Sequence, residues 1–249
     1  IALEKAGVMR PFAPCIFADK NPPSVLLSHA KNLSSNFLFN NNDFFIKIFK
    51  DSWSWNDKFL KIKDLPLLPL VGDFQYNHAG AALKALKIIN PDILKDKEKL
   101  SKGFLNIVLL GRYQKLSDYP EIIIDVAHNA DSAKKLQLNL LKFPKKRTMA
   151  VLGVLTDKDV YSLIKPMTGI VDEWFCGTID NERGMNSEEI KIRMSTGVNK
   201  KYISTYLDMD SAFYEAIKTL KNDDRLIVYG SFYTVSEFLL YLKYNKSKL

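Results

Sequence analysis

Short apolar runs alternate with amphipathic helical stretches through the second half of the sequence, and this alternation constrains the fold more than any other feature. Continuous apolar strands separated by helices are typical of a parallel sheet that is covered on both faces. We therefore predict an α/β fold, with a Rossmann-like, mostly parallel, doubly wound domain. Strands are expected at residues 121–125, 148–154, 170–176, 202–206 and 225–229, and helices at 131–142, 157–167, from about 186, 211–220 and 234–242.

The carboxyl ends of such parallel strands are where ligands bind. The loops that follow Asp125, Val154, Cys176 and Tyr229 are therefore the candidate ligand-binding loops.

The first half is less regular. A polar stretch with a proline, residues 115–120, suggests a domain boundary, with one domain at 1–116 and the other at 117–249. Before it we expect a helix at 24–32, antiparallel strands at 37–39 and 44–49, an extended edge segment at 65–71, a helix at 77–89 and another helix from Pro91.

Charge and cysteine content narrow the class of protein. The 249 residues carry a net charge of +8, but only six of the 36 basic residues are arginine, and the lysines are spread along the chain. Nucleic-acid surfaces usually cluster their basic residues and rely on arginine, so we predict no nucleic-acid partner. Cys15 and Cys176 lie far apart, which fits a reducing, cytoplasmic location. No apolar stretch approaches the 18 or so residues of a membrane span.

Six short sequence motifs stand out along the chain. They are Glu4-Lys-Ala-Gly-Val8, Asn77 at the start of an alanine-rich helix, Gly111-Arg-Tyr-Gln114, Asp125-Val-Ala-His-Asn129, Asp157-Lys-Asp159 and Asp224-Arg-Leu-Ile-Val-Tyr-Gly-Ser-Phe-Tyr-Thr-Val235. In this order and spacing they resemble the folylpolyglutamate synthase/dihydrofolate synthase family. These are ATP-dependent amide ligases of the Mur ligase superfamily.

The resemblance implies an ADP-forming ligase that adds L-glutamate to dihydropteroate, or to the glutamate tail of reduced folates, through an acyl phosphate. It implies ATP and Mg²⁺ as cofactors, small-molecule partners, a cytoplasmic monomer and no membrane. Residues 1–116 would then be the tail of a P-loop ATPase domain. The chain begins with Ile and has no G-x-x-G-K-[ST] motif, so we expect a processed chain or a fragment that is inactive alone.

The resemblance also assigns residues. Asn77, Arg112 and Asp125 are expected to bind ATP, and Lys5 is expected to bind the metal as N6-carboxylysine, whose oxygens suit Mg²⁺. Other interpretations are open: a helix cap for Asn77 and for Asp125, a salt bridge for Arg112, and an exposed lysine beside Glu4 for Lys5.

His128 is a candidate catalytic residue that would orient a phosphate or the incoming amine, and a structural histidine is equally compatible with the sequence. Ser231 is a candidate substrate-binding residue, or it caps the last helix. Two other functions are compatible with the sequence. One is another Mur-type ligase of cell-wall synthesis, and the other is a non-catalytic Rossmann module that binds a nucleotide or nucleic acid.

Overall fold

The computed structural model describes residues 2–245, which form two compact units, one up to Val108 and one from Leu109. The sequence suggested a boundary after residue 116. The structure differs because the polar stretch is not a linker. It forms strand β6 (Gln114–Asp118) and the turn into β7 (Glu121–Ile124), and both strands belong to the sheet of the second unit.

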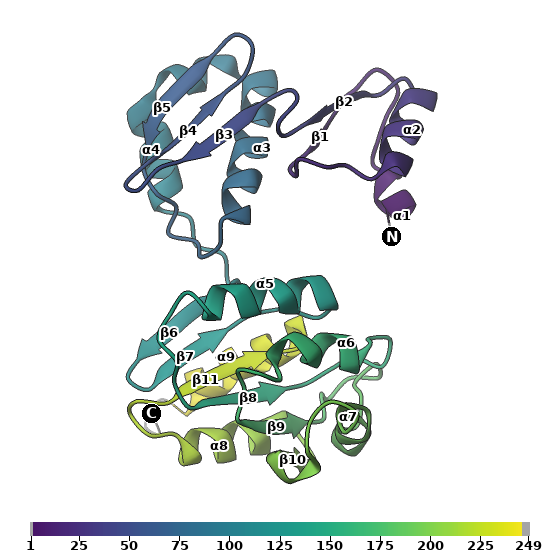
Figure 1. The fold of residues 1–249 in the computed structure, drawn as a ribbon, viewed down its shortest axis with the longest axis vertical. Helices are drawn as coiled ribbons and strands as arrows, with labels where there is room; N and C mark the ends of the chain where they lie inside the picture. Colours follow the sequence, from purple (N-terminus) through teal and green to yellow (C-terminus); the bar gives the residue numbers. More distant parts are fainter. Residues whose placement is uncertain (1, 246–249) are drawn as a thin grey trace. The chain divides into compact units, whose positions relative to one another are not determined.

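Most of the first unit is built on an antiparallel sheet of β3, β4 and β5, packed with helices α3 and α4 (Figure 1). Trp53, Trp55, Leu65 and Leu83 are fully buried in its core. The elements are β3 (Phe45–Ile48), β4 (Trp53–Asn56), β5 (Lys61–Leu65), α3 (Phe74–Ile89), the 3-10 turn η1 (Pro91–Lys95) and α4 (Lys97–Leu105).

The remainder of this unit is a parallel strand pair with helices. It comprises α1 (Ala2–Ala6), β1 (Pro14–Phe17), α2 (Ser24–Asn32) and β2 (Asn36–Phe39). Of the two predicted antiparallel strands, the one at 44–49 is confirmed, because β3 is antiparallel to β4. The prediction for 37–39 is wrong, because β2 is parallel to β1. Helix α2 is a crossover that brings β2 beside β1, and parallel strands need such a crossover. The expected extended segment at 65–71 contributes only Leu65 to a strand.

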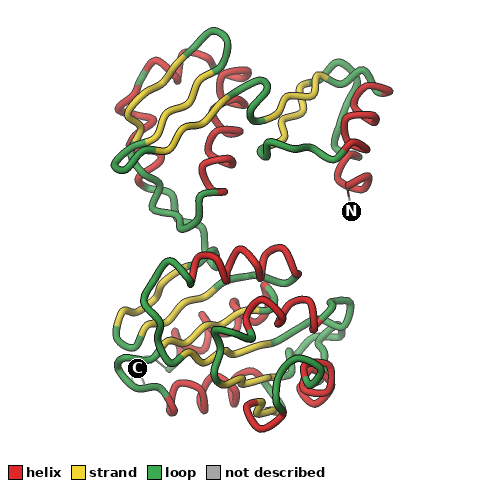
Figure 2. Tube along the Cα trace, viewed as in Figure 1, coloured by secondary structure: helices red, strands yellow, loops and turns green. Residues whose placement is uncertain are grey.

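The second unit contains a six-stranded sheet with the strand order β10-β9-β8-β11-β7-β6. All neighbouring strands are parallel except β6, which is an antiparallel edge strand. The remaining strands are β8 (Thr148–Leu152), β9 (Glu173–Gly177), β10 (Ile203–Tyr206) and β11 (Arg225–Tyr229). Figure 2 shows the strands and helices alternating along this unit. The predicted α/β fold with a mostly parallel, doubly wound sheet is confirmed.

Helices cover both faces of this sheet (Figure 1). On one face lie α5 (Ala130–Leu140), α6 (Val160–Ile164) with the 3-10 turn η2 (Lys165–Met167), and α7 (Ser187–Met194). On the other face lie α8 (Met209–Thr219), which follows η3 (Lys200–Tyr202) and β10, and α9 (Phe232–Tyr244). Within residues 2–245, none of the helices is both long and apolar enough to cross a membrane.

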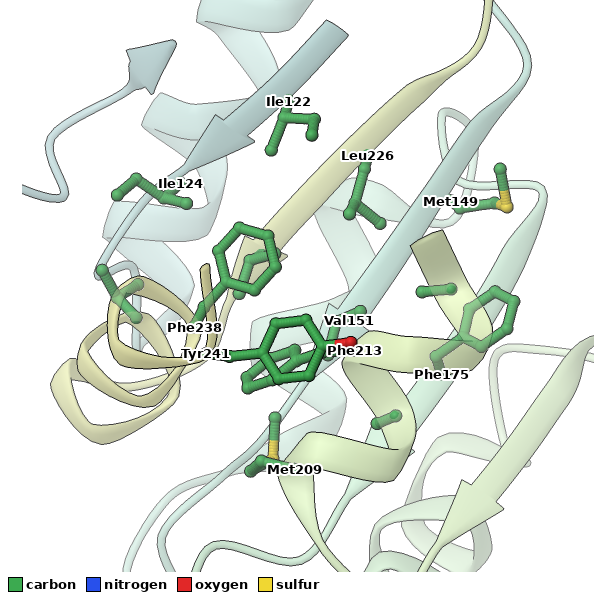
Figure 3. Packing of buried hydrophobic residues seen from close by; sticks show 14 of the residues in the cluster. Ile122, Ile124, Met149, Val151, Phe175, Met209, Phe213, Leu226, Phe238 and Tyr241 are labelled. Atoms are coloured by element: carbon green, nitrogen blue, oxygen red, sulfur yellow. The ribbon is translucent and has the colours of Figure 1, made fainter. Parts of the chain in front are cut away.

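The core beneath α8 and α9 is built from every second residue of the strands, because successive side chains of a strand point to opposite faces. Figure 3 shows these strand residues facing aromatic side chains from the two helices. The strands contribute Ile122, Ile124, Met149, Val151, Phe175 and Leu226, and the helices contribute Met209, Phe213, Phe238 and Tyr241.

A candidate nucleotide site at the carboxyl ends of β7 and β11

The strands β7 and β11 are neighbours, but the chain leaves them toward opposite faces of the sheet. It leaves β7 toward α5 on one face and β11 toward α9 on the other. In open α/β sheets, ligands usually bind beyond the carboxyl ends of the strands at such a reversal. Two of the predicted loops, residues 125–129 and 230–232, meet here, since the Gly230 N–H donates to the Ala127 carbonyl at 3.0 Å.

Asp125 follows β7, and the backbone holds both of its carboxylate oxygens. Oδ2 accepts the Tyr113 N–H and Oδ1 accepts the Ala127 N–H, each at 2.8 Å. The interpretation of Asp125 as the cap of α5 is therefore wrong. Asn129 caps that helix by accepting the Ser132 N–H at 2.9 Å.

The carboxyl group of Asp125 is held in a partly dehydrated position. Burial raises its pKa from 3.8 to about 6, although the two backbone N–H groups and the nearby charges of Arg112 and His128 act in the opposite direction. The carboxylate thus keeps a fixed orientation, in which its oxygens can accept further hydrogen bonds.

Arg112 is placed by a tight turn beside this carboxylate. Gly111 has a φ of 66°, and a Cβ there would lie 2.8 Å from Val126, so the turn requires glycine. The Val126 N–H donates to the Gly111 carbonyl at 2.8 Å, which ties the turn to the Asp125 loop. The exposed Arg112 guanidinium lies 5.8 Å from the centre of the Phe232 ring, and no described residue forms an ion pair with it.

His128 also lies beside this aromatic ring. Its ring centre is 6.1 Å from that of Phe232, and Nδ1 lies 2.9 Å from the Val126 carbonyl. Phe232 therefore contacts both predicted residues, yet sequence reasoning did not select it. The available signal was a large aromatic residue directly after Gly230 and Ser231. Tyr113, whose N–H holds Asp125, was missed in the same way beside Arg112.

Ser231 is buried and caps α9. Its Oγ accepts the Thr234 N–H at 2.9 Å, while the Thr234 hydroxyl donates to the Gly153 carbonyl at 2.9 Å. These bonds connect the ends of β11 and β8. The capping interpretation therefore describes Ser231 in this structure, and a role in substrate binding stays a prediction.

Asn77 lies in the first unit, inside α3 rather than at its start, so it is not the helix cap. Its Oδ1 accepts a hydrogen bond from Asn40 and its Nδ2 donates to Asp19, each at 3.0 Å. The amide thus joins three segments of that unit. Its role in ATP binding stays a prediction.

Lys5 also lies in the first unit, and its side chain is 74% exposed, with the amine 3.5 Å from a Glu4 carboxylate oxygen. This agrees with the interpretation of Lys5 as an exposed lysine beside Glu4. Among residues 2–245 there is no group of three or more His, Cys, Asp or Glu side chains that could hold a metal ion. The described residues do not form a metal site by themselves, and the carbamate at Lys5 stays a prediction.

Comparison with known proteins places these features in a family. The model for the Mur ligase, glutamate ligase domain matches residues 111–232. The dihydrofolate synthase/folylpolyglutamate synthase of Haemophilus influenzae is 29% identical over 96% of this chain and 57% of its own length. The protein of the same name from Buchnera aphidicola subsp. Baizongia pistaciae is 32% identical over 100% of this chain and 56% of its own length.

Solved structures of proteins with these names are also similar to this chain. Escherichia coli FolC in complex with ADP superposes with a TM-score of 0.87 at 27% identity, over 99% of this chain and 57% of that one. A bifunctional folylpolyglutamate synthase/dihydrofolate synthase with Mn, AMPPNP and L-glutamate bound gives 0.83 at 26% identity, over 97% of this chain and 56% of that one. The chain thus spans a little over half the length of these relatives. It belongs to the folylpolyglutamate synthase/dihydrofolate synthase family of the Mur ligase superfamily.

Proposed function

We propose that this chain forms part of an ATP-dependent amide ligase that adds L-glutamate to dihydropteroate, to the glutamate tail of reduced folates, or to both. The observation that carries the proposal is the cluster beyond the carboxyl ends of β7 and β11, where Arg112 and His128 both lie beside Phe232 and both interact with the Asp125 carboxylate. Relatives were solved with ADP, and one with AMPPNP, Mn and L-glutamate.

The side chains beyond the carboxyl ends of β7 and β11 suit a nucleoside triphosphate. An oriented carboxylate such as Asp125 accepts hydrogen bonds from ribose hydroxyls. The Arg112 guanidinium offers a planar fork of donors for phosphate oxygens. The exposed Phe232 ring holds Arg112 and His128 close to the same position, so His128 can orient a phosphate or the incoming amine.

The reaction that follows has two displacements. A carboxylate oxygen of the folate or pteroate attacks the γ-phosphorus of ATP, and ADP leaves, which gives an acyl phosphate. The amine of L-glutamate then attacks the acyl carbon, and phosphate leaves as the amine loses its proton. The residues of this chain would contribute by positioning and by stabilising charge.

The proposal covers the remaining assignments as well. The first unit, up to Val108, is the tail of the ATPase domain. Asn77 contacts the nucleotide, Ser231 lies close to the glutamate substrate and Lys5 carries the carbamate. The partners are small molecules only, and the protein is a cytoplasmic monomer. A divalent cation accompanies ATP, and the described residues assemble no ligand set for it beyond the predicted carbamate of Lys5.

Nucleotide binding tests the proposal directly. We expect the full chain to bind ADP in isothermal titration calorimetry, and Asp125→Ala and Arg112→Ala each to weaken this binding by about tenfold or more. Asp131→Asn, which removes an exposed carboxylate in the next helix, is the matched control and should bind normally. ADP affinity that is the same in all four proteins would contradict the site.

A cell-wall ligase is the alternative with an observation behind it. A UDP-N-acetylmuramoyl-L-alanyl-D-glutamate–2,6-diaminopimelate ligase of Prochlorococcus marinus is 30% identical over 66% of this chain. Competition assays with dihydropteroate and with a nucleotide-activated sugar peptide separate the two. A nucleic-acid-binding module, suggested by the net charge of +8, would instead show RNA affinity that falls steeply with salt.

A further inference from the structure

A groove of about 610 Å³ lies where α8 and α9 meet the end of β10. Its lining consists of three tyrosines, two acidic residues and a serine, without a lysine or an arginine among them. This is unusual on a chain with a net charge of +8. The lining residues are Tyr206, Asp210, Ser211, Tyr214, Glu215 and Tyr241.

The two carboxylates of the groove are five positions apart on α8. Asp210 is exposed in the first turn of the helix, and no described residue forms an ion pair with it. Glu215 has only a loose contact with Lys218, at 3.6 Å and near the surface. A further acid, Glu237, lies close to Asp210. Burial raises the pKa of Glu237 to about 7, and the charges of Asp210 and Asp180 add to that shift.

The hydroxyl of a nearly buried tyrosine lines the same groove. Tyr241 is 8% exposed and projects from α9 toward α8, where its ring lies 5.6 Å from that of Phe213 (Figure 3). Its hydroxyl has no hydrogen-bond partner among residues 2–245. The nearby charge of Asp210 contributes to a raised pKa of this hydroxyl, after burial. A ligand N–H group in the groove would supply a partner for this hydroxyl.

These groups suit an extended organic cation better than a metal ion. The described carboxylates are too dispersed to form a group of three or more metal-ligating side chains. Ammonium groups can meet separate carboxylates, while methylene groups pack on tyrosine rings, whose faces attract cations. The ring of Tyr206 is held in place by stacking on Phe175, with centres 6.1 Å apart.

We propose that this groove binds a linear aliphatic diammonium or polyammonium ion. Asp210 and Glu215 contact separate ammonium groups, the Tyr241 hydroxyl accepts one further N–H, and the tyrosine rings cover the methylene chain.

The test is a calorimetric titration of the full chain at low salt with spermidine, 1,4-diaminobutane and n-butylamine. We expect saturable binding of one spermidine per chain, and affinity about tenfold or more weaker for n-butylamine, which has a single ammonium group. Binding that does not saturate would overturn the proposal. So would displacement of spermidine by an equal concentration of Mg²⁺, because it would mean that only charge density is recognised.

Variants locate the site. Asp210→Asn and Glu215→Gln should each weaken spermidine binding by about tenfold, and Tyr241→Phe, which keeps the ring, by several-fold. Glu98→Gln is the matched control, because it removes an exposed carboxylate from the first turn of α4 in the other unit. Circular dichroism checks that each variant is folded. Equal weakening in Glu98→Gln, or unchanged binding in both carboxylate variants, would refute the assignment.

Discussion

At the scale of single residues, the burial of the Asp125 carboxyl group makes the free energy of unfolding depend on pH. Burial raises its pKa from 3.8 to about 6 in the folded chain. The folded state therefore binds this proton more tightly than the unfolded state. The contribution of Asp125 to stability is fully present below about pH 4 and is lost as the pH rises toward 6.

We expect Asp125→Asn to remove this dependence. The free energy of unfolding of the wild type, relative to the variant, should fall by at most about 3 kcal/mol between pH 4 and pH 7. Urea denaturation at a series of pH values measures it. Asp131→Asn, in the first turn of α5, is the control and should follow the wild type. Parallel curves for the wild type and Asp125→Asn would contradict the prediction.

At the scale of elements, Gly80 sets how closely α3 packs on the antiparallel sheet. A Cβ at Gly80 would lie 2.4 Å from Cδ1 of Ile46 and 3.3 Å from the ring of Phe44. Trp55 also donates its indole N–H to the Gly80 carbonyl at 3.0 Å. We expect Gly80→Ala to lower the free energy of unfolding by about 1–3 kcal/mol, because overpacking outweighs the better helix propensity of alanine.

A glycine in the neighbouring helix α4 provides the control. A Cβ at Gly103 meets nothing within 4 Å, so Gly103→Ala should raise the free energy of unfolding by roughly 0.5–1 kcal/mol. Both variants are measured by urea denaturation. A stabilised Gly80→Ala would show that helix propensity, and not the contact with β3, controls this position.

At the scale of the whole molecule, the second unit has a core and a covered sheet of its own. Helices cover both faces of the sheet, and β6 closes one edge with an antiparallel strand. We expect residues 109–249 to fold alone and to unfold in one cooperative transition. Trp174 is the one tryptophan of this stretch and is 1% exposed, so its fluorescence reports on the core. Fluorescence and circular dichroism transitions at different urea concentrations would contradict this expectation.

The parallel sheet was predictable because its strands are buried on both faces and stand out as apolar runs. Ile122, Ile123 and Ile124 illustrate this, since all three are buried. The pairing of Phe37–Phe39 was not predictable. A short apolar strand has the same local pattern beside either neighbour, and the crossover through α2 decides which one it contacts.

The candidate site was predictable in position but not in detail. Asp125 stands at the end of an apolar run, and parallel sheets bind ligands there. The bonds of Asn77 to Asn40 and Asp19 depend on contacts between segments distant in sequence. Ser231 has the same local sequence whether it caps α9 or binds a ligand. The ring of Phe232 lies beside Arg112 and His128. These contacts depend on the fold and could not be predicted from the spacing of residues in the sequence.

The place of β11 in the sheet has a consequence for synthesis on the ribosome. Residues Arg225–Tyr229 lie between β7 and β8, although they follow every other described strand in the chain. Until they leave the exit tunnel, the nascent chain carries two unpaired inner strand edges, which are prone to wrong pairing. The sheet can be completed only after its last strand has been made, and premature termination shortly before Arg225 would release a chain without the strand that joins β7 to β8.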